Sequence, residues 1–165
     1  MAKFKNPLSE HQWNCFSQRF KGAASCNVDA LVNELMKSIP EQAEADYGVE
    51  VRAARETITI GGLFSAKDQP GILFSFPKKP NYAQILVGLN KIGAILDVEA
   101  VQYGTVSKNM QHSNMSKADH GFSLGGMAKS ALYDLITDTN AVEEENMHYS
   151  AVLDSLEGVV QSWLA

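Results

Sequence analysis

The sequence predicts an α+β protein in which N- and C-terminal helices pack around a mainly antiparallel sheet. Apolar residues recur at helical spacing toward both ends of the chain, whereas from Val49 onward the apolar period falls to two. Two helices followed by a run of strands do not give the alternating βαβ units of a parallel sheet. With 165 residues, 45% hydrophobic and 20% charged, the chain matches one globular domain. We therefore expect a single α+β domain over residues 1–165, with a long polar loop at about 105–120.

Two helices are expected before the strands. Ser9 and Gln12 form a capping box that begins the first helix, and Gly22 ends it. Asn27 is the next residue suited to cap a helix. The apolar stripes at helical spacing are Trp13, Phe16 and Phe20 in the first helix, and Val28, Leu31, Val32, Leu35, Met36 and Ile39 in the second.

Pro40 interrupts the second of these helices. A proline inside a helix removes a backbone hydrogen bond, and Ser38 with Glu41 repeats the Ser-x-x-Glu capping pattern. We expect the helix to kink at this point, restart, and end near Gly48.

The middle of the chain is predicted to form strands. Val49, Val51 and Ala53 alternate with Glu50, Arg52 and Ala54. Residues 57–60 are all β-branched. The sequence Lys-Asp-Gln-Pro-Gly over 67–71 is typical of a turn. The apolar run 72–76 is then expected to complete a hairpin that Pro77 closes.

Residues 81–91 fit two structures. One is a short helix capped by Asn81, and the other is a strand over 84–89 that turns directly after it. We favour the helix. Residues 95–103 are expected to form a strand in either case.

The last third of the chain combines a polar segment with two helices. Residues 105–120 have no sustained apolar period and are expected to form the long loop. Helical spacing returns over 124–136, and a long closing helix is expected over 140–163. We expect Trp13 and Trp163 to pack terminal helices on one sheet face.

Charge and hydropathy exclude several classes of protein. The formal net charge of −5 argues against general nucleic-acid binding, because affinity for phosphate comes mainly from clustered Lys and Arg. No stretch approaches the ~18 apolar residues of a membrane span, and the first residues lack the apolar run of a signal peptide. Cys15 and Cys26 are too few for a disulfide framework. We expect an acidic, soluble, intracellular protein that resides in the cytoplasm and has no membrane association.

Residues 121–126, Gly-Phe-Ser-Leu-Gly-Gly, contain the pattern G-x-S-x-G. The pattern resembles the nucleophile elbow of α/β-hydrolases, and this resemblance implies Ser123 as a nucleophile with His148 as a partner further along the chain. An elbow needs a buried apolar strand before it, whereas residues 114–120 are polar. We therefore expect Ser123 to cap the helix that follows it.

Neither a metal nor a cofactor is expected. The four histidines lack the fixed spacing of metal ligands, and neither Gly61-Gly62 nor Gly125-Gly126 is followed by the lysine of a phosphate-binding loop. We interpret Pro77-Lys78-Lys79-Pro80 as residues that end an edge strand.

These observations favour a non-enzymatic protein-interaction protein, an adaptor, chaperone or inhibitor that acts by binding another macromolecule. The expected partner is a protein, and a homo-oligomer stays open. A loop of this length is usually functional or disordered, so we place the binding residues there. They are Lys108, Met110, His112, Asn114, Met115 and Lys117. The alternatives are a small hydrolase that uses Ser123 and a structural subunit of a larger assembly.

Overall fold

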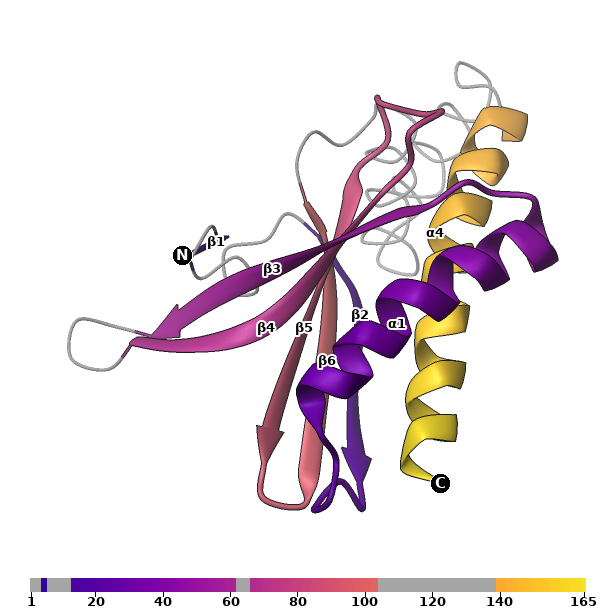
Figure 1. The fold of residues 1–165 in the computed structure, drawn as a ribbon. Coiled ribbons are helices and arrows are strands. Elements are labelled where there is room, and N and C mark those ends of the chain that lie inside the picture. Colours follow the sequence, from indigo (N-terminus) through magenta and orange to yellow (C-terminus); the bar gives the residue numbers. More distant parts are fainter. Residues whose placement is uncertain (1–3, 6–12, 62–65, 104–138) are drawn as a thin grey trace, which may run out of the picture.

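The computed structural model describes residues 4–5, 13–61, 66–103 and 139–165. These residues form a six-stranded sheet with helices on one face (Figure 1). The strand order is β1-β3-β4-β5-β6-β2, and among these described strands only the two-residue β1 runs parallel to its neighbour. The bounds are β1 Phe4–Lys5, β2 Trp13–Lys21, β3 Arg52–Gly61, β4 Ala66–Ser75, β5 Gln84–Ile92 and β6 Ile95–Tyr103. The predicted α+β class with a mainly antiparallel sheet is confirmed.

Two long helices within the described ranges cover one face of the sheet, side by side (Figure 1). Helix α1 spans Val28–Gln42 and continues into a π-helical turn, η1, over Ala43–Tyr47. Helix α4 spans Thr139–Leu164, which confirms the predicted closing helix. The predicted cap at Asn27 is also confirmed, because the Asn27 side-chain oxygen accepts a hydrogen bond of 3.1 Å from the Ala30 backbone N–H.

The main core lies between the helices and this face of the sheet. Fully buried side chains from both helices meet those of β4, β5 and β6. They include Leu31, Leu35 and Ile39 of α1, Val152, Leu156 and Val160 of α4, and Ile72, Phe74, Ile85, Val87 and Val98 of the sheet. A smaller cluster of Ile58, Leu86 and Val101 occupies the opposite sheet face.

The helix predicted from Ser9 onward is wrong over the residues that the structure describes. Residues 13–21 form β2, which pairs with β6 in a register that places Phe20 opposite Leu96. Phe16 and Phe20 are four residues apart, and this spacing puts two side chains on one side of a helix or of a strand. The pattern therefore could not distinguish the two structures.

The helix favoured for 81–91 is also wrong, because β5 occupies most of this segment. Strand β5 lies inside the sheet, and its Leu86 and Val87 are buried on opposite faces. A strand that is buried on both faces shows a continuous apolar run in place of alternation. The strand predicted over 95–103 is confirmed as β6.

The turn predicted over 67–71 is wrong, since these residues lie within β4. Strand β4 pairs with β3 from Ser75 opposite Arg52 to Ala66 opposite Gly61, so the connection between the two strands falls at 62–65, outside the described residues. The tetrapeptide 77–80 joins β4 to β5, and both strands have neighbours on either side. The interpretation of 77–80 as the end of an edge strand is therefore wrong.

The predicted restart of the helix at Pro40 is wrong as well, whereas the predicted kink stays a prediction. Helix α1 continues through Pro40, and Ser38 donates a hydrogen bond to Glu34 in the preceding turn. The widened turn of η1 follows, and the chain leaves the helix at Gly48, whose φ of 67° suits a residue without a Cβ. The predicted end near Gly48 is thus confirmed.

Trp163 does not contribute to the core as expected, because 38% of its surface is exposed at the end of α4. The described residues do not include the predicted helix over 124–136 or the predicted loop over 105–120. The side chain of Trp13 is likewise not described.

The difference in burial along α4 gives a test of the fold. Leu156→Ala should reduce the free energy of unfolding by about 2–5 kcal/mol, because it removes a fully buried side chain. Trp163→Ala should cost less than about 1 kcal/mol. Urea unfolding of both variants measures the difference, and equal losses would contradict the packing of α4 described above.

Candidate functional site

The sheet divides at the end of the β4–β5 ladder. These strands pair from Phe74 opposite Ile85 to Gly71 opposite Gly88 and no further. Beyond this point β4 continues beside β3, while β5 continues beside β6 to the turn that follows Ile92. Figure 1 shows the two arms diverging. We call the space between them the fork, bounded by residues 66–70 of β4 and 89–92 of β5.

The residues at the base of the fork explain why pairing ends there. Pro70 has no backbone N–H, so it cannot donate to a strand on that side. Gly71 follows, and a Cβ at this position would lie 2.6 Å from Cδ1 and 2.9 Å from Cγ1 of Ile58. The side chain of Ile58 therefore occupies the space over Gly71 that another residue would need.

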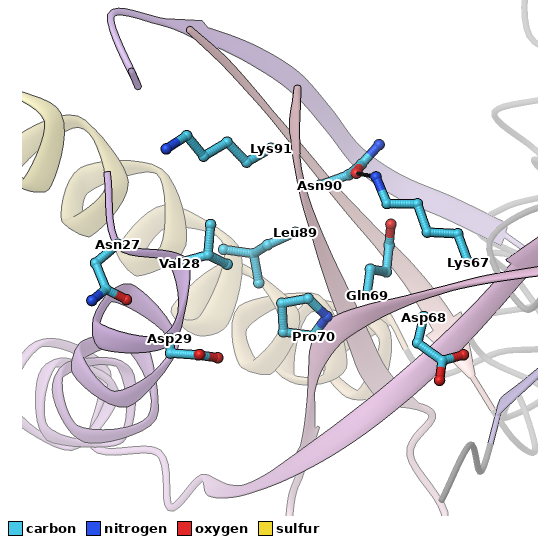
Figure 2. Close-up of a pocket in the computed structure, with 10 residues that line it drawn as sticks. All are labelled: Asn27, Val28, Asp29, Lys67, Asp68, Gln69, Pro70, Leu89, Asn90 and Lys91. Atoms are coloured by element: carbon cyan, nitrogen blue, oxygen red, sulfur yellow. Dashed lines mark hydrogen bonds between the residues drawn. The ribbon is translucent and has the colours of Figure 1, made fainter. Parts of the chain in front are cut away.

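A cleft of about 290 Å³ lies within the fork and reaches the N-terminus of α1 (Figure 2). The cleft is lined by Asn27, Val28 and Asp29 of the α1 start, Lys67, Asp68, Gln69 and Pro70 of β4, and Leu89, Asn90 and Lys91 of β5.

One side of the cleft is polar. The Lys67 Nζ atom donates a hydrogen bond of 2.9 Å across the fork to Oδ1 of Asn90. Figure 2 shows Gln69 directed toward this pair. Gln69 is only 6% exposed, yet its carboxamide makes no hydrogen bond with the residues that the structure describes. A buried carboxamide that finds no hydrogen-bond partner costs about 1–3 kcal/mol.

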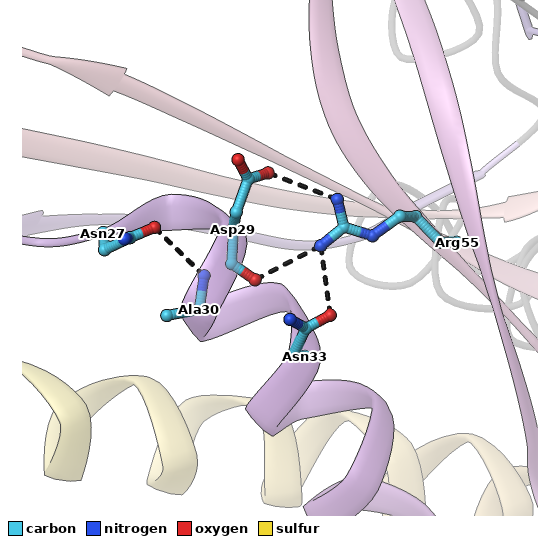
Figure 3. Close-up of polar contacts among 5 residues, drawn as sticks. All are labelled: Asn27, Asp29, Ala30, Asn33 and Arg55. Atoms are coloured by element: carbon cyan, nitrogen blue, oxygen red, sulfur yellow. Dashed lines mark hydrogen bonds and ion pairs between the residues drawn. The ribbon is translucent and has the colours of Figure 1, made fainter.

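The other side of the cleft is held in place by contacts of the α1 start. The Lys91 Nζ atom donates to the backbone oxygens of Ala24 at 2.8 Å and Cys26 at 3.0 Å. Arg55 of β3 donates to a side-chain oxygen of Asp29 and to the side chain of Asn33, each at 3.2 Å (Figure 3). These contacts fix the position of α1 relative to both arms.

A second polar cluster lies where the 76–83 segment meets α4. The Tyr149 hydroxyl accepts a hydrogen bond of 3.0 Å from the Ala83 N–H and donates one of 3.3 Å to the fully buried Glu145. Burial raises the pKa of Tyr149 far above its ordinary value. The His148 ring meets the rings of Phe76 and Tyr82 edge-on. These groups are engaged with one another, and we assign them to anchoring the 76–83 segment.

The cysteines are free thiols. Cys15 donates from Sγ to the backbone oxygen of Ala100 at 3.4 Å, and burial raises the pKa of this thiol to about 12. Very little of Cys15 is therefore thiolate at neutral pH, which makes it a poor nucleophile.

The binding residues predicted from the sequence stay a prediction. Lys108, Met110, His112, Asn114, Met115 and Lys117 lie outside the described residues, as does Ser123. Within the described ranges, no group of three His, Cys, Asp or Glu side chains is placed to hold a metal ion. In the same ranges, no helix has the length and apolar character needed to cross a membrane.

Sequence reasoning missed the fork because it assigned Lys67–Gly71 to a turn. A usable signal was present in Pro70, since proline within a sheet is confined to edges, bulges or places where pairing stops. The burial of Gln69 had no comparable signal, because Lys67 and Asp68 directly before it are polar as well.

In comparisons with known proteins, no family model, curated protein or solved structure matches this chain.

The base of the fork gives a second test. Gly71→Ala should reduce stability by about 1–3 kcal/mol, because the added methyl group collides with Ile58. Gly158→Ala is the matched control: the new methyl group in α4 meets no atom within 4 Å, so stability should rise by about 0.5–1 kcal/mol. Thermal or urea unfolding measures both. A Gly71→Ala variant as stable as the parent would show that Ile58 does not pack over this glycine.

Proposed function

We propose that this chain is a non-enzymatic protein-interaction protein that binds an extended segment of a partner protein in the fork. The observation that carries the proposal is the end of the β4–β5 ladder at Gly71 and Gly88, which leaves two facing strand edges beside a cleft. The backbone groups of an unpaired strand edge are a template for another strand.

The edge of β5 is the better of the two for adding a strand. Residues 89–92 contain no proline, whereas Pro70 removes a donor from the facing edge of β4. A segment paired with β5 would lie about 4.8 Å from it and present its side chains alternately to the two sheet faces. On the α1 side these side chains would meet Val28, Pro70 and Leu89, and on the opposite side they would meet the polar group around Gln69.

Binding in the fork also has a favourable energetic basis. A bound segment would satisfy the Gln69 carboxamide as well as backbone groups, and the arms are already held apart by the pairing of each with its other neighbour. Little ordering of the protein would therefore oppose binding. The hydrolase and assembly-subunit alternatives stay predictions from the sequence, because Ser123 and the 105–120 segment lie outside the described residues.

The proposal is tested with a library of random 12-residue peptides displayed on phage and selected on the immobilised protein. Asn90→Tyr fills the cleft with a bulky residue that suits a strand, and it should reduce the affinity of the selected peptides at least tenfold. Ser17→Tyr is the control: it makes the same change at an exposed position of β2, on the sheet face opposite the helices, and should leave the affinity unchanged.

Far-UV circular dichroism and urea unfolding confirm that both variants are folded. Failure to select any peptide, or peptides that bind the parent and Asn90→Tyr equally, would contradict binding in the fork.

A further inference from the structure

We propose that the segment bound in the fork carries an Asp or Glu side chain whose carboxylate is held by Lys67 and Gln69. This inference rests on the proposed function and adds the chemistry that the fork recognises. A neighbouring residue of the same segment, on the α1 side, is apolar.

The carboxamide of Gln69 is the first reason. Gln69 is only 6% exposed, it lines the cleft, and no described residue forms a hydrogen bond with its carboxamide. A buried polar group without a partner is rare in a folded protein. A ligand that accepts a hydrogen bond from the Gln69 N–H would explain this one. A carboxylate oxygen is a strong acceptor for an amide N–H and for an ammonium group at once.

Lys67 supplies the positive charge beside Gln69. Among the described residues Lys67 donates to the neutral Asn90 side chain alone, so two of its three N–H groups remain for an acceptor from outside them. Lys67 and Gln69 are two residues apart on β4, and alternate residues of a strand face the same side. Asn90 joins them from β5, so the three side chains converge on one point of the fork (Figure 2).

The charges around the cleft are also suited to an acid. Lys67 and Lys91 line it with Asp29 and Asp68, and Arg55 pairs with Asp29 at 3.2 Å. The lining therefore carries two cations and two acids, in a chain whose net charge is −5, and one of these acids is already paired. Asp97, the partner of Asn90 in the β5–β6 register, is held by Arg19 at 2.8 Å. The fork is thus less acidic than the chain as a whole.

The opposite side of the fork explains the apolar neighbour. Leu89 is 1% exposed and belongs to the main core, and Pro70 lies across the fork from it (Figure 2). Val28 at the start of α1 completes this apolar side. A strand between the two sides therefore places one residue against Lys67 and Gln69 and the next against these apolar groups.

The test uses the phage-selected 12-residue peptides and a double-mutant cycle. The enriched sequences should contain Asp or Glu next to an apolar residue. Synthetic versions with blocked ends, in which that Glu is replaced by Gln or that Asp by Asn, should bind the parent protein about tenfold more weakly. Against Lys67→Met the same peptide change should cost less than about twofold, because the charge that the carboxylate meets is gone. Lys78→Met, which removes an exposed lysine outside the fork, should keep the tenfold loss.

The outcomes separate the two proposals. Suppose that the peptides no longer bind Asn90→Tyr. Carboxylate recognition would then be overturned, and binding in the fork would stand, if removing the acid from the peptide had no effect on affinity. The same conclusion would follow if removing the acid weakened binding equally to the parent and to Lys67→Met. Peptides whose binding does not depend on Asn90→Tyr would overturn both.

Discussion

The β4–β5 ladder stops at the Gly71–Gly88 pair, and the arrangement of the sheet beyond this point depends on that stop. Pro70 cannot donate to β5, and the side chain of Ile58 lies over Gly71. On the paired side, Ile72, Phe74, Ile85 and Val87 bring β4 and β5 together under the two helices. On the other side the strands separate as two arms, each kept in a regular ladder by its remaining neighbour. The paired part of β4 and β5 therefore contributes to the core, and the unpaired part of the same two strands bounds the cleft.

Contacts of the α1 start keep the cleft in a defined shape. The Arg55–Asp29 ion pair is largely exposed, and pairs of this kind add at most about 1 kcal/mol to stability. Its effect is geometric, because Arg55 links β3 to the first turns of α1 while Lys91 links β5 to the residues before that helix. A binding site whose walls are already fixed loses less conformational entropy when a ligand enters. The buried Gln69 carboxamide in this wall has no hydrogen-bond partner among the described residues.

The sequence predicted those elements whose pattern belongs to one structure alone. The Asn27 cap with its 3.6-residue stripe, the strand over 95–103 and the closing helix are examples. It failed where one pattern fits two structures, as with Phe16 and Phe20 in β2, or where a central strand shows no alternation, as in β5. The sequence did not predict the candidate site for a related reason. Whether Pro70 lies in a turn or at the end of a ladder depends on where β5 runs, which is a tertiary property that local spacing does not carry.

Amide hydrogen exchange, followed residue by residue by NMR, tests the central claim most directly. In the free protein the amides of Ile72–Phe74 and Ile85–Val87 should exchange slowly, whereas those amides of Leu89–Ile92 that point away from β6 should exchange orders of magnitude faster. A peptide bound in the fork should slow the second group and leave the first unchanged. Slow exchange that continues from Gly88 through Lys91 in the free protein would show that β5 has no open edge and would contradict the account.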